Sequence, residues 1–546
     1  MSHPNPSTAL ARVVVDELAA RGVELVVISP GSRSAALAIA ATEHPQLATR
    51  VFIDERSAAF HALGAARASQ RPAAVVSTSG TAVANLLPAV VEADMSCVPL
   101  VVVSADRPAE LRGVGANQAI DQVGLFGSKV RAFVDIPAPS PANDANTAWR
   151  GLVADSIVAA TGPTPGPVHL NVGFREPTVP VSDDGRTTSI PYRFATPRVT
   201  RDVAMAPANR PLPLPRLEPR QGLVIAGDGE YSRDALADRA AELGWPVLAT
   251  AMSGMRGGRV ITTYHHLLGD GVPPELVPET VVAVGAIGPS PRLEDLVATA
   301  RTRLRVDRWG RTIDPRRNAS HLVDGDVVEL LGRVDGEAPP EWEAAWMDAE
   351  GDRRAELDAH LGSLEQMSGP GIAAVLNDVD WNALVVASSL PIRDVDAHLR
   401  RSGAIYANRG ASGIDGFVST ALGVASVQPR TLAFTGDLSL LHDSNGFLHD
   451  GEIDLTIVVM DNEGGGLFDS LPQAVHAPDY ERLFVTPPLR DLAALAGFHH
   501  LRHHRADDLV ALRGLADAAL GCNGIDLVVA RVERSYDLGA RAQLDR

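Results

Sequence analysis

Two apolar runs in the last third of the chain place the strongest limit on its fold. The first, Thr431–Phe434, leads into Asp437, with a helix-like segment after it. The second, Leu455–Met460, leads into Asn462 and the glycines Gly464–Gly466. Strands joined through a helix run parallel, and their carboxyl ends meet at the sheet edge where α/β proteins bind ligands. The pattern therefore predicts that Asp437 and Asn462 lie together at a ligand-binding edge.

The residue types at this edge favour a metal and a phosphate. The hard oxygens of Asp437 and Asn462 suit Mg²⁺, which keeps few protein ligands and takes the rest from phosphate and water. The helix expected after Asp437 directs its N-terminal amides to the same place, where they favour an anion. Gly464–Gly466 allow the backbone to approach a ligand closely. These features predict a metal-bridged diphosphate; the alternative is an ordinary βαβ unit with polar strand ends.

The spacing from Gly436-Asp437 to Asn462 resembles the thiamine diphosphate (ThDP) motif. The usual motif is Gly-Asp-Gly ending in Asn-Asn, and here Leu438 replaces the third glycine and Asp461 the first asparagine. The resemblance implies ThDP as cofactor, held through Mg²⁺ or Mn²⁺. The expected metal ligands are Asp437, Asn462 and the carbonyl of Gly464.

The rest of the chain alternates strand-like and helix-like patterns, which predicts an α/β fold of doubly wound parallel sheets. The expected strands are Glu24–Ser29, Arg50–Asp54, Ala73–Thr78, Pro99–Ser104, Val168–Val172, Gly222–Ala226, Pro246–Thr250, Thr280–Val284, Leu304–Asp307, Ala383–Ala387, Ala404–Tyr406, Thr431–Phe434, Leu455–Met460 and Leu527–Val532. Helical patterns include Ser57–Ala68 and Thr81–Met95. The glycine-rich turn at Ala226–Glu230 is read as a tight βα turn, with a nucleotide site as the alternative.

Three such units, with the diphosphate motif in the last, match the order of domains in ThDP enzymes: three doubly wound parallel-sheet domains. The expected organisation is a pyrimidine-binding domain over 1–180, a proline-rich linker over 181–220, a central domain over 221–335, a second linker over 336–367, and a diphosphate-binding domain over 368–546.

Composition narrows the class of protein. A net charge of −18 argues against non-specific nucleic-acid binding. The two cysteines form no metal-ligand spacing and no disulfide framework, which fits a reducing compartment. The N-terminal sequence lacks a signal-peptide pattern, and no apolar run is long enough for a membrane span. We therefore expect a cytoplasmic enzyme without nucleic-acid partners or membrane insertion.

Glu55 stands where the second predicted strand gives way to a helix. ThDP enzymes place a glutamate at this point, where it hydrogen-bonds the aminopyrimidine ring and promotes deprotonation of the thiazolium C2. The resemblance therefore implies that Glu55 activates the cofactor. The alternative is an acid in the first turn of a helix, stabilised by the helix dipole.

Polar and cationic segments follow other predicted strands of the first domain. Ser29–Ser34 and Ser104–Pro108 each carry an arginine, and Gly115–Gln118 is a polar turn in a non-helical loop. Hydroxyls, amides and guanidinium groups of this kind bind carboxylates. A single strand-end arginine is more often a surface charge, but three such segments on one sheet edge favour an anion site.

The third domain makes the resemblance closer. Ser388–Arg393 and Ala407–Gly416 each follow a strand. Together with Pro-Gly-Ser-Arg-Ser, Ile-Asp-Glu-Arg, Thr-Ser-Gly-Thr-Ala, Gly-Ala-Asn-Gln and Gly-Asp-Leu-Ser, they resemble the 2-succinyl-5-enolpyruvyl-6-hydroxy-3-cyclohexene-1-carboxylate (SEPHCHC) synthase family of ThDP enzymes. The matching pieces run from residue 29 to about residue 470, and Gly-Asp-Leu is this family's own variant of the motif.

The resemblance implies a role for each matching position. The expected catalytic residues are Glu55, Arg393 and Arg409. The expected cofactor-binding residues are Glu55, Asn408, Ser412, Ile414, Asp437, Leu438, Ser439, Asn462, Gly464, Leu467 and Phe468. The expected substrate-binding residues are Ser32, Arg33, Arg107, Asn117, Gln118, Arg292, Ser389, Arg393 and Arg409. Ile414 would wedge the cofactor into its bent form. Pro291 stands where the family often has lysine, so a second cation beside Arg292 is missing.

The family's activity follows as an expectation. A transferase of this kind decarboxylates 2-oxoglutarate, adds the succinyl carbanion equivalent to isochorismate in a 1,4 sense, and releases CO₂ in menaquinone biosynthesis. The architecture implies a homodimer or a dimer of dimers with active sites at the subunit interface. Two alternatives stay open: another ThDP-dependent 2-oxo acid decarboxylase or carboligase, such as an acetohydroxyacid synthase, and a non-catalytic nucleotide-binding paralogue.

Overall fold

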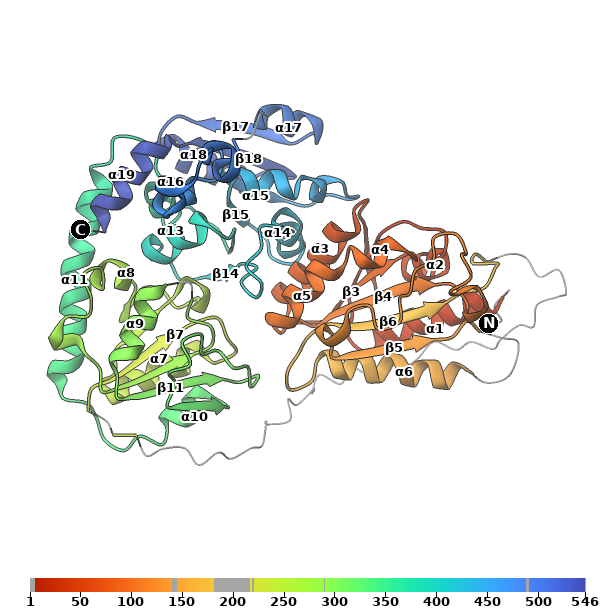
Figure 1. The fold of residues 1–546 in the computed structure, drawn as a ribbon, viewed down its shortest axis with the longest axis horizontal. Helices are drawn as coiled ribbons and strands as arrows, with labels where there is room; N and C mark the ends of the chain where they lie inside the picture. The colour runs from red at the N-terminus through yellow and green to blue at the C-terminus, as the bar shows by residue number, and fades with distance from the viewer. Residues whose placement is uncertain are drawn as a thin grey trace. The chain divides into compact units, whose positions relative to one another are not determined.

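The computed structural model describes residues 5–139, 145–180, 217–218, 220–288, 290–487 and 491–545. Within them the chain forms three six-stranded sheets in which every pair of neighbouring strands is parallel (Figure 1). Helices alternate with the strands along the chain. The predicted α/β class with three parallel sheets is confirmed.

The first sheet has the order β2-β1-β3-β4-β6-β5. Its strands are β1 (Leu25–Ile28), β2 (Ala48–Val51), β3 (Ala73–Ser77), β4 (Leu100–Asp106), β5 (Ala132–Ile136) and β6 (Val168–Gly173). Its helices are α1 (Pro6–Ala20), α2 (Ala35–Glu43), α3 (Glu55–Ser69), α4 (Thr81–Ala84), α5 (Leu87–Met95) and α6 (Ala145–Ala160). Side chains of α1, α2 and α6 form one apolar core with the strands, and those of α3 and α5 form another. The sheet is thus covered on both faces, which explains why its central strands β3 and β4 are buried along their whole length.

The second sheet has the order β12-β11-β10-β7-β8-β9. Its strands are β7 (Gly222–Ala226), β8 (Val247–Ala249), β9 (Val260–Ile261), β10 (Thr280–Val284), β11 (Thr302–Asp307) and β12 (His321–Asp324). Its helices are α7 (Arg233–Leu243), α8 (Tyr264–Leu267), α9 (Pro291–Thr299) and α10 (Val327–Leu331), followed by the long α11 (Pro340–Gly362).

The third sheet has the order β14-β13-β15-β16-β18-β17. Its strands are β13 (Ala383–Val386), β14 (Ala404–Tyr406), β15 (Thr431–Gly436), β16 (Leu455–Asp461), β17 (Arg502–Ala506) and β18 (Ile525–Arg531). Its helices are α12 (Gly369–Val375), α13 (Leu390–His398), α14 (Phe417–Ala425), α15 (Asp437–His442), α16 (Gln473–His476), α17 (Leu492–Phe498), α18 (Leu509–Ala519) and α19 (Arg534–Leu544).

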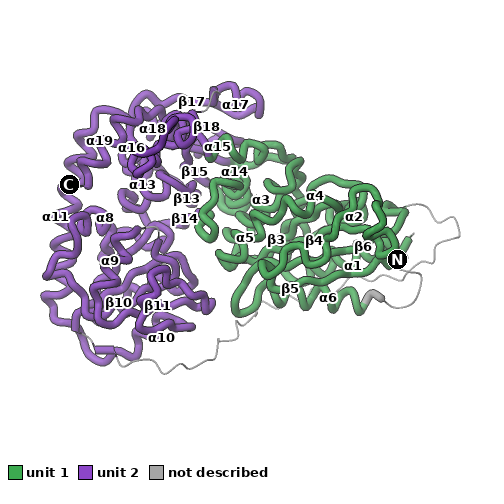
Figure 2. Tube along the Cα trace, in the orientation of Figure 1, with its two compact units in different colours: residues 1–205, 408–429, 439–454 green, residues 206–407, 430–438, 455–546 purple. Residues whose placement is uncertain are grey.

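The chain packs as two compact units (Figure 2). Unit 1 contains the described residues within 1–205, 408–429 and 439–454, and unit 2 contains those within 206–407, 430–438 and 455–546. In unit 1, α3 and α14 touch through glycines: a Cβ at Gly64 would lie 2.3 Å from the Thr420 carbonyl oxygen, and one at Gly423 would lie 2.2 Å from that of His61. Close packing of these helices joins 408–429 to the first sheet.

The predicted domain boundaries stay a prediction, because the compact units group the chain by packing and not by sheet. Most of the predicted linker at 181–220 lies outside the described residues. Within the described parts of the chain, no helix combines the length and apolar character that crossing a bilayer requires.

Two predicted elements were wrong in detail. The helix predicted over Thr81–Met95 is two helices, α4 and α5, because Pro88 lacks the N–H that a continuous helix would use and its ring crowds the preceding turn. The strand predicted over Arg50–Asp54 ends at Val51. Phe52 instead forms an antiparallel bridge with His449, so the chain leaves the sheet before α3 begins.

Candidate functional site

Two guanidinium groups interact at the carboxyl edge of the first sheet. Arg33, between β1 and α2, is buried; it donates to the Phe174 carbonyl at 3.0 Å and pairs with Glu176 at 3.1 Å. Burial lowers the pKa of Arg33, and the charge of Arg107 lowers that pKa further, with Glu176 opposing both. An anion bound here would relieve this repulsion, which is the electrostatic setting of a carboxylate site.

Arg107 follows β4 directly and is held by the next loop. Its Nε and Nη2 donate to the Asn117 carbonyl at 3.2 and 2.5 Å. Gln118 donates to the Ser79 carbonyl at 3.0 Å, and the Ser79 hydroxyl donates to the Gln118 carbonyl at 2.9 Å. The loops after β3 and β4 are therefore tied together, and the predicted substrate residues Arg107, Asn117 and Gln118 lie in one cluster.

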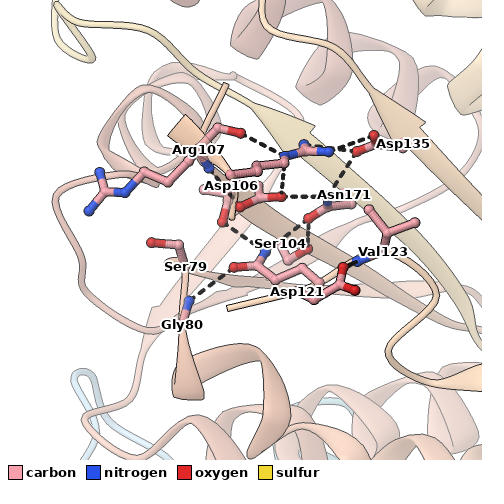
Figure 3. Close-up of polar contacts among 12 residues, drawn as sticks. Ser79, Gly80, Ser104, Asp106, Arg107, Asp121, Val123, Asp135 and Asn171 are labelled. Atoms are coloured by element: carbon pink, nitrogen blue, oxygen red, sulfur yellow. Dashed lines mark hydrogen bonds and ion pairs between the residues drawn. The ribbon is translucent and has the colours of Figure 1, made fainter. Parts of the chain in front are cut away.

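A polar network lies behind Arg107 (Figure 3). The Asn171 amide donates to Asp106 and Asp135, each at 2.9 Å, and Arg112 pairs with the same two carboxylates at 3.0 and 2.8 Å. Arg112 also donates to the Arg107 carbonyl at 3.0 Å. Sequence reasoning missed this network. A polar residue in the buried run Val168–Val172 was the available signal, because buried polar groups need partners.

Glu55 is the first residue of α3. Asp54 caps the helix by accepting from Arg56 and Ser57. The segment before it is fixed by the backbone, since Ile53 donates to the Leu448 carbonyl at 3.2 Å. Glu55 is half-buried, so its carboxyl can meet a ligand, and its role in activating ThDP stays a prediction.

The predicted cofactor residues Asn408, Ser412 and Ile414 share the loop between β14 and α14. The Asn408 amide donates to the Thr420 hydroxyl at 3.0 Å, which anchors the start of the loop on α14. Ser412 has a positive φ of 62°, a left-handed backbone conformation that is uncommon for residues other than glycine. Ile414 is 38% exposed, so it lies outside the core, and its role as a support for the cofactor stays a prediction.

In unit 2, Asp437 lies at the end of β15 with its carboxylate buried. One oxygen accepts from the Leu438 amide and the other from the Gly464 amide, both at 2.7 Å. Burial raises the pKa of Asp437 to about 7, against the opposing effect of the Leu438 hydrogen bond and with Asp461 adding to the rise. A divalent cation would favour the ionised carboxylate and offset this cost of burial.

The loop after β16 is shaped by close contacts. Asn462 is buried, and a Cβ at Gly466 would lie 2.4 Å from its amide nitrogen. Gly464 has a φ of +124°, and a Cβ there would lie 2.2 Å from the Val485 carbonyl oxygen. Only glycine fits at Gly464, and the hydrogen bond from its amide brings this loop to Asp437.

These residues fit the predicted metal. They offer one carboxylate, one side-chain amide and one backbone carbonyl, the oxygen ligands that suit Mg²⁺ or Mn²⁺ beside a diphosphate. The described residues contain no cluster of three or more His, Cys, Asp or Glu able to hold a metal, and this site would not form one because it uses a single acid. The ligand set stays a prediction.

Arg393 and Arg292 differ in their partners. Arg393 lies inside α13, donates to the Ser389 carbonyl at 2.7 Å, and has its pKa lowered chiefly by burial. Among the described residues no carboxylate forms an ion pair with it, so its guanidinium is available to a substrate carboxylate. Arg292 instead donates to the His265 carbonyl and pairs with Asp545 at 3.1 Å.

The predicted site residues divide between the two units. Unit 1 contains Ser32, Arg33, Glu55, Arg107, Asn117, Gln118, Asn408, Arg409, Ser412, Ile414 and Ser439. Unit 2 contains Arg292, Ser389, Arg393, Asp437, Leu438, Asn462, Gly464, Leu467 and Phe468.

Comparison with known proteins gives the class and then the family. Residues 8–125 match the model of the thiamine pyrophosphate enzyme, N-terminal TPP binding domain. With three parallel α/β sheets, this defines a thiamine diphosphate-dependent enzyme.

Curated relatives match along nearly the whole chain. The SEPHCHC synthase of Thermobifida fusca is 42% identical, over 99% of this chain and 98% of its own length. Those of Chloroflexus aurantiacus and Rubrobacter xylanophilus are 40% and 39% identical, over 98% and 97% of this chain and 95% and 97% of their own lengths. The chain belongs to the SEPHCHC synthase family and is a transferase.

Proposed function

We propose that this enzyme decarboxylates 2-oxoglutarate and adds the succinyl unit to isochorismate in a 1,4 sense, releasing CO₂, as a step of menaquinone biosynthesis. The observation that carries the proposal is the match to curated SEPHCHC synthases along nearly the whole chain. Bound ThDP supplies the electron sink for this chemistry. The chain's own residues bind and orient the substrates.

The arginines support dicarboxylate substrates. Arg33 and Arg107 repel one another across a partly buried site, and Arg393 lacks a carboxylate partner among the described residues. Each can form a bidentate contact to a carboxylate that does not react, which fixes the position of the reacting carbons. A pyruvate enzyme has no need of three such cations.

The cofactor and metal sites are proposed on the same basis. Asp437, Asn462 and the Gly464 carbonyl would hold Mg²⁺ or Mn²⁺, and Ile414 would support the bent cofactor. Glu55 would hold and exchange the proton of the aminopyrimidine ring. A buried carboxylate whose nearest partners are two backbone amides supports the metal assignment at Asp437.

We further propose a cytoplasmic homodimer or dimer of dimers whose active sites lie at the subunit interface, with Glu55 of one subunit serving the diphosphate held by the other. Mixing the variants Glu55→Gln and Asp437→Ala tests this. A shared site predicts that mixed dimers recover part of the activity, because one of their two sites carries neither change. No recovery after verified subunit exchange would overturn the interface proposal.

One assay tests the reaction. Purified protein with ThDP and Mg²⁺ is given 2-oxoglutarate, with and without isochorismate, and product and CO₂ are measured. We expect the product SEPHCHC, and CO₂ in equal amount, only when both 2-oxoglutarate and isochorismate are present. Turnover of pyruvate as fast as 2-oxoglutarate would favour the general decarboxylase or carboligase alternative. Membership of an enzyme family already favours catalysis over the non-catalytic paralogue.

A further inference from the structure

A buried carboxylate on α5 holds the loop that carries Arg409. Glu92 is 2% exposed. One of its oxygens accepts from the Gly410 amide at 2.8 Å, and the other accepts from the Ala411 amide at 2.6 Å. These two amides directly follow Arg409 in the chain, so the carboxylate acts on the backbone of the predicted catalytic arginine.

The position of Glu92 is itself fixed. The hydroxyl of Ser96, the residue directly after α5, donates to it at 2.7 Å. Among the described residues no Lys, Arg or His forms an ion pair with Glu92, so its partners there are these three uncharged donors. Burying an ionised carboxylate is costly unless hydrogen bonds compensate, and here two of the three come from the loop.

The loop also meets α5 through van der Waals contact. A Cβ added at Gly410 would lie 2.6 Å from the Ser96 hydroxyl oxygen and 2.9 Å from the Met95 Cβ. The backbone at Gly410 therefore approaches the end of α5 so closely that only glycine fits there. The hydrogen bonds to Glu92 and the contact at Gly410 specify the same placement of the loop.

We propose that Glu92 is a positioning residue that sets where Arg409 presents its guanidinium to substrate. The inference deepens the proposed function and rests on it. A carboxylate contact depends on guanidinium placement, and a displacement of about 1 Å can cost about a hundredfold in rate. Glu92 is therefore needed for substrate selection although it meets neither substrate nor cofactor.

Glu92→Gln is the first test, because the amide keeps the shape but presents N–H groups to one of the two loop amides. At saturating ThDP and Mg²⁺ we expect kcat/KM for at least one of the two dicarboxylates to fall by about tenfold or more, chiefly through KM. Gly410→Ala displaces the same loop without touching the carboxylate, and should change kcat/KM in the same direction.

Glu350→Gln is the matched control. Glu350 is also a buried carboxylate that accepts from two successive backbone amides, those of Thr262 and Thr263, but it holds a loop without predicted site residues. Unlike Glu92, it also pairs with an arginine, Arg354, at 2.8 Å. Both variants should lower the thermal midpoint, and only Glu92→Gln should change kcat/KM by tenfold. Equal effects on kcat/KM would reduce Glu92 to a structural residue.

A double-mutant cycle separates positioning from stability. If Glu92 acts through Arg409, then adding Glu92→Gln to Arg409→Ala lowers kcat/KM little further. Additive losses, or normal kcat/KM in both Glu92→Gln and Gly410→Ala, would overturn the inference. Absence of wild-type activity with 2-oxoglutarate and isochorismate would instead overturn the proposed function, so the two failures are distinct.

Discussion

The first and third sheets share one strand order, but the loops at their carboxyl edges carry different chemistry. Numbered from its own first strand, each sheet reads 2-1-3-4-6-5. The middle sheet reads 3-2-1-4-5-6 when counted the same way. Equivalent loops of the first and third sheets can therefore be compared position by position.

After the first strand both sheets place an arginine, Arg33 in one and Arg393 in the other. After the fourth strand they diverge, with Arg107 in the first sheet and Asn462 in the third. The third strand leads to Asp437 in the third sheet alone. The carboxyl edge is where parallel α/β sheets bind ligands. We expect the residues at the strand ends to determine whether that edge binds an anion, as in the first sheet, or a cation, as in the third.

Removing Asp437 should have the largest effect, because it is the acid that distinguishes the third sheet. We expect Asp437→Ala to abolish Mg²⁺-dependent retention of ThDP, since the diphosphate loses its charged bridge. Calorimetric titration of ThDP with and without chelator measures this, and Asp443→Asn serves as a buried-carboxylate control. Unchanged ThDP affinity in Asp437→Ala would contradict the assignment of Asp437 as a metal ligand.

The variant Glu55→Gln tests whether the residue that follows the second strand of the first sheet activates the cofactor. Glu55→Gln keeps the shape but cannot exchange a proton, so deuterium exchange at the thiazolium C2 should slow by at least roughly a hundredfold. NMR of quenched samples measures the exchange rate. Glu110→Gln, an exposed carboxylate on the same sheet edge, should leave it unchanged. A wild-type exchange rate in Glu55→Gln would refute the role.

The arginines after the two first strands sharpen the comparison. Arg33→Ala and Arg393→Ala should each lower kcat/KM for at least one dicarboxylate by roughly ten- to a hundredfold, from a contact of about 1.5–3 kcal/mol. Measuring 2-oxoglutarate and isochorismate separately shows which arginine serves which substrate. Arg400→Ala, which removes an exposed guanidinium just after α13, is the control. Full activity in both Arg33→Ala and Arg393→Ala would show that neither arginine binds a substrate carboxylate.

The sequence was most informative where chemistry follows an apolar strand. The carboxyl ends of β15 and β16 could be predicted because both runs are mostly apolar and are followed by ligand-type residues. The prediction omitted β5, β9, β12 and β17, which all lie at sheet edges. β17 is rich in Arg and His and mostly exposed, so it lacks the apolar pattern of a buried strand.

Polar contacts between residues far apart in the chain could not be predicted from the sequence. Glu92 lies in a helical apolar run and its partners at Gly410 and Ala411 are more than three hundred positions away, so no local pattern links them. Arg112 and Asn171 share the carboxylates of Asp106 and Asp135 because β6 lies between β4 and β5 in the sheet. Strand ends can be predicted from local periodicity, whereas the residues that hold the loops need the tertiary structure.

The smallest effect concerns a second buried acid that stands six residues after Asp437. Burial raises the pKa of Asp443 to about 6, against a hydrogen bond from the Ser419 amide at 2.8 Å. A carboxyl whose pKa is raised on folding stabilises the fold most when it is protonated, and this contribution is lost as pH rises through the folded-state value.

Wild-type protein should therefore lose about 1 kcal/mol of stability from this group between pH 5 and 7, relative to Asp443→Asn. Asparagine keeps the acceptor for Ser419 and can donate to the Ser57 hydroxyl, so the variant should fold and bind ThDP. Urea denaturation at several pH values measures the difference. Because Asp443 is not a predicted metal ligand, Mg²⁺ and ThDP should leave this pH slope unchanged. If Mg²⁺ abolished the pH dependence of stability, Asp443 would also respond to the cation. The assignment of Asp437 as the one acid that binds the metal would then fail.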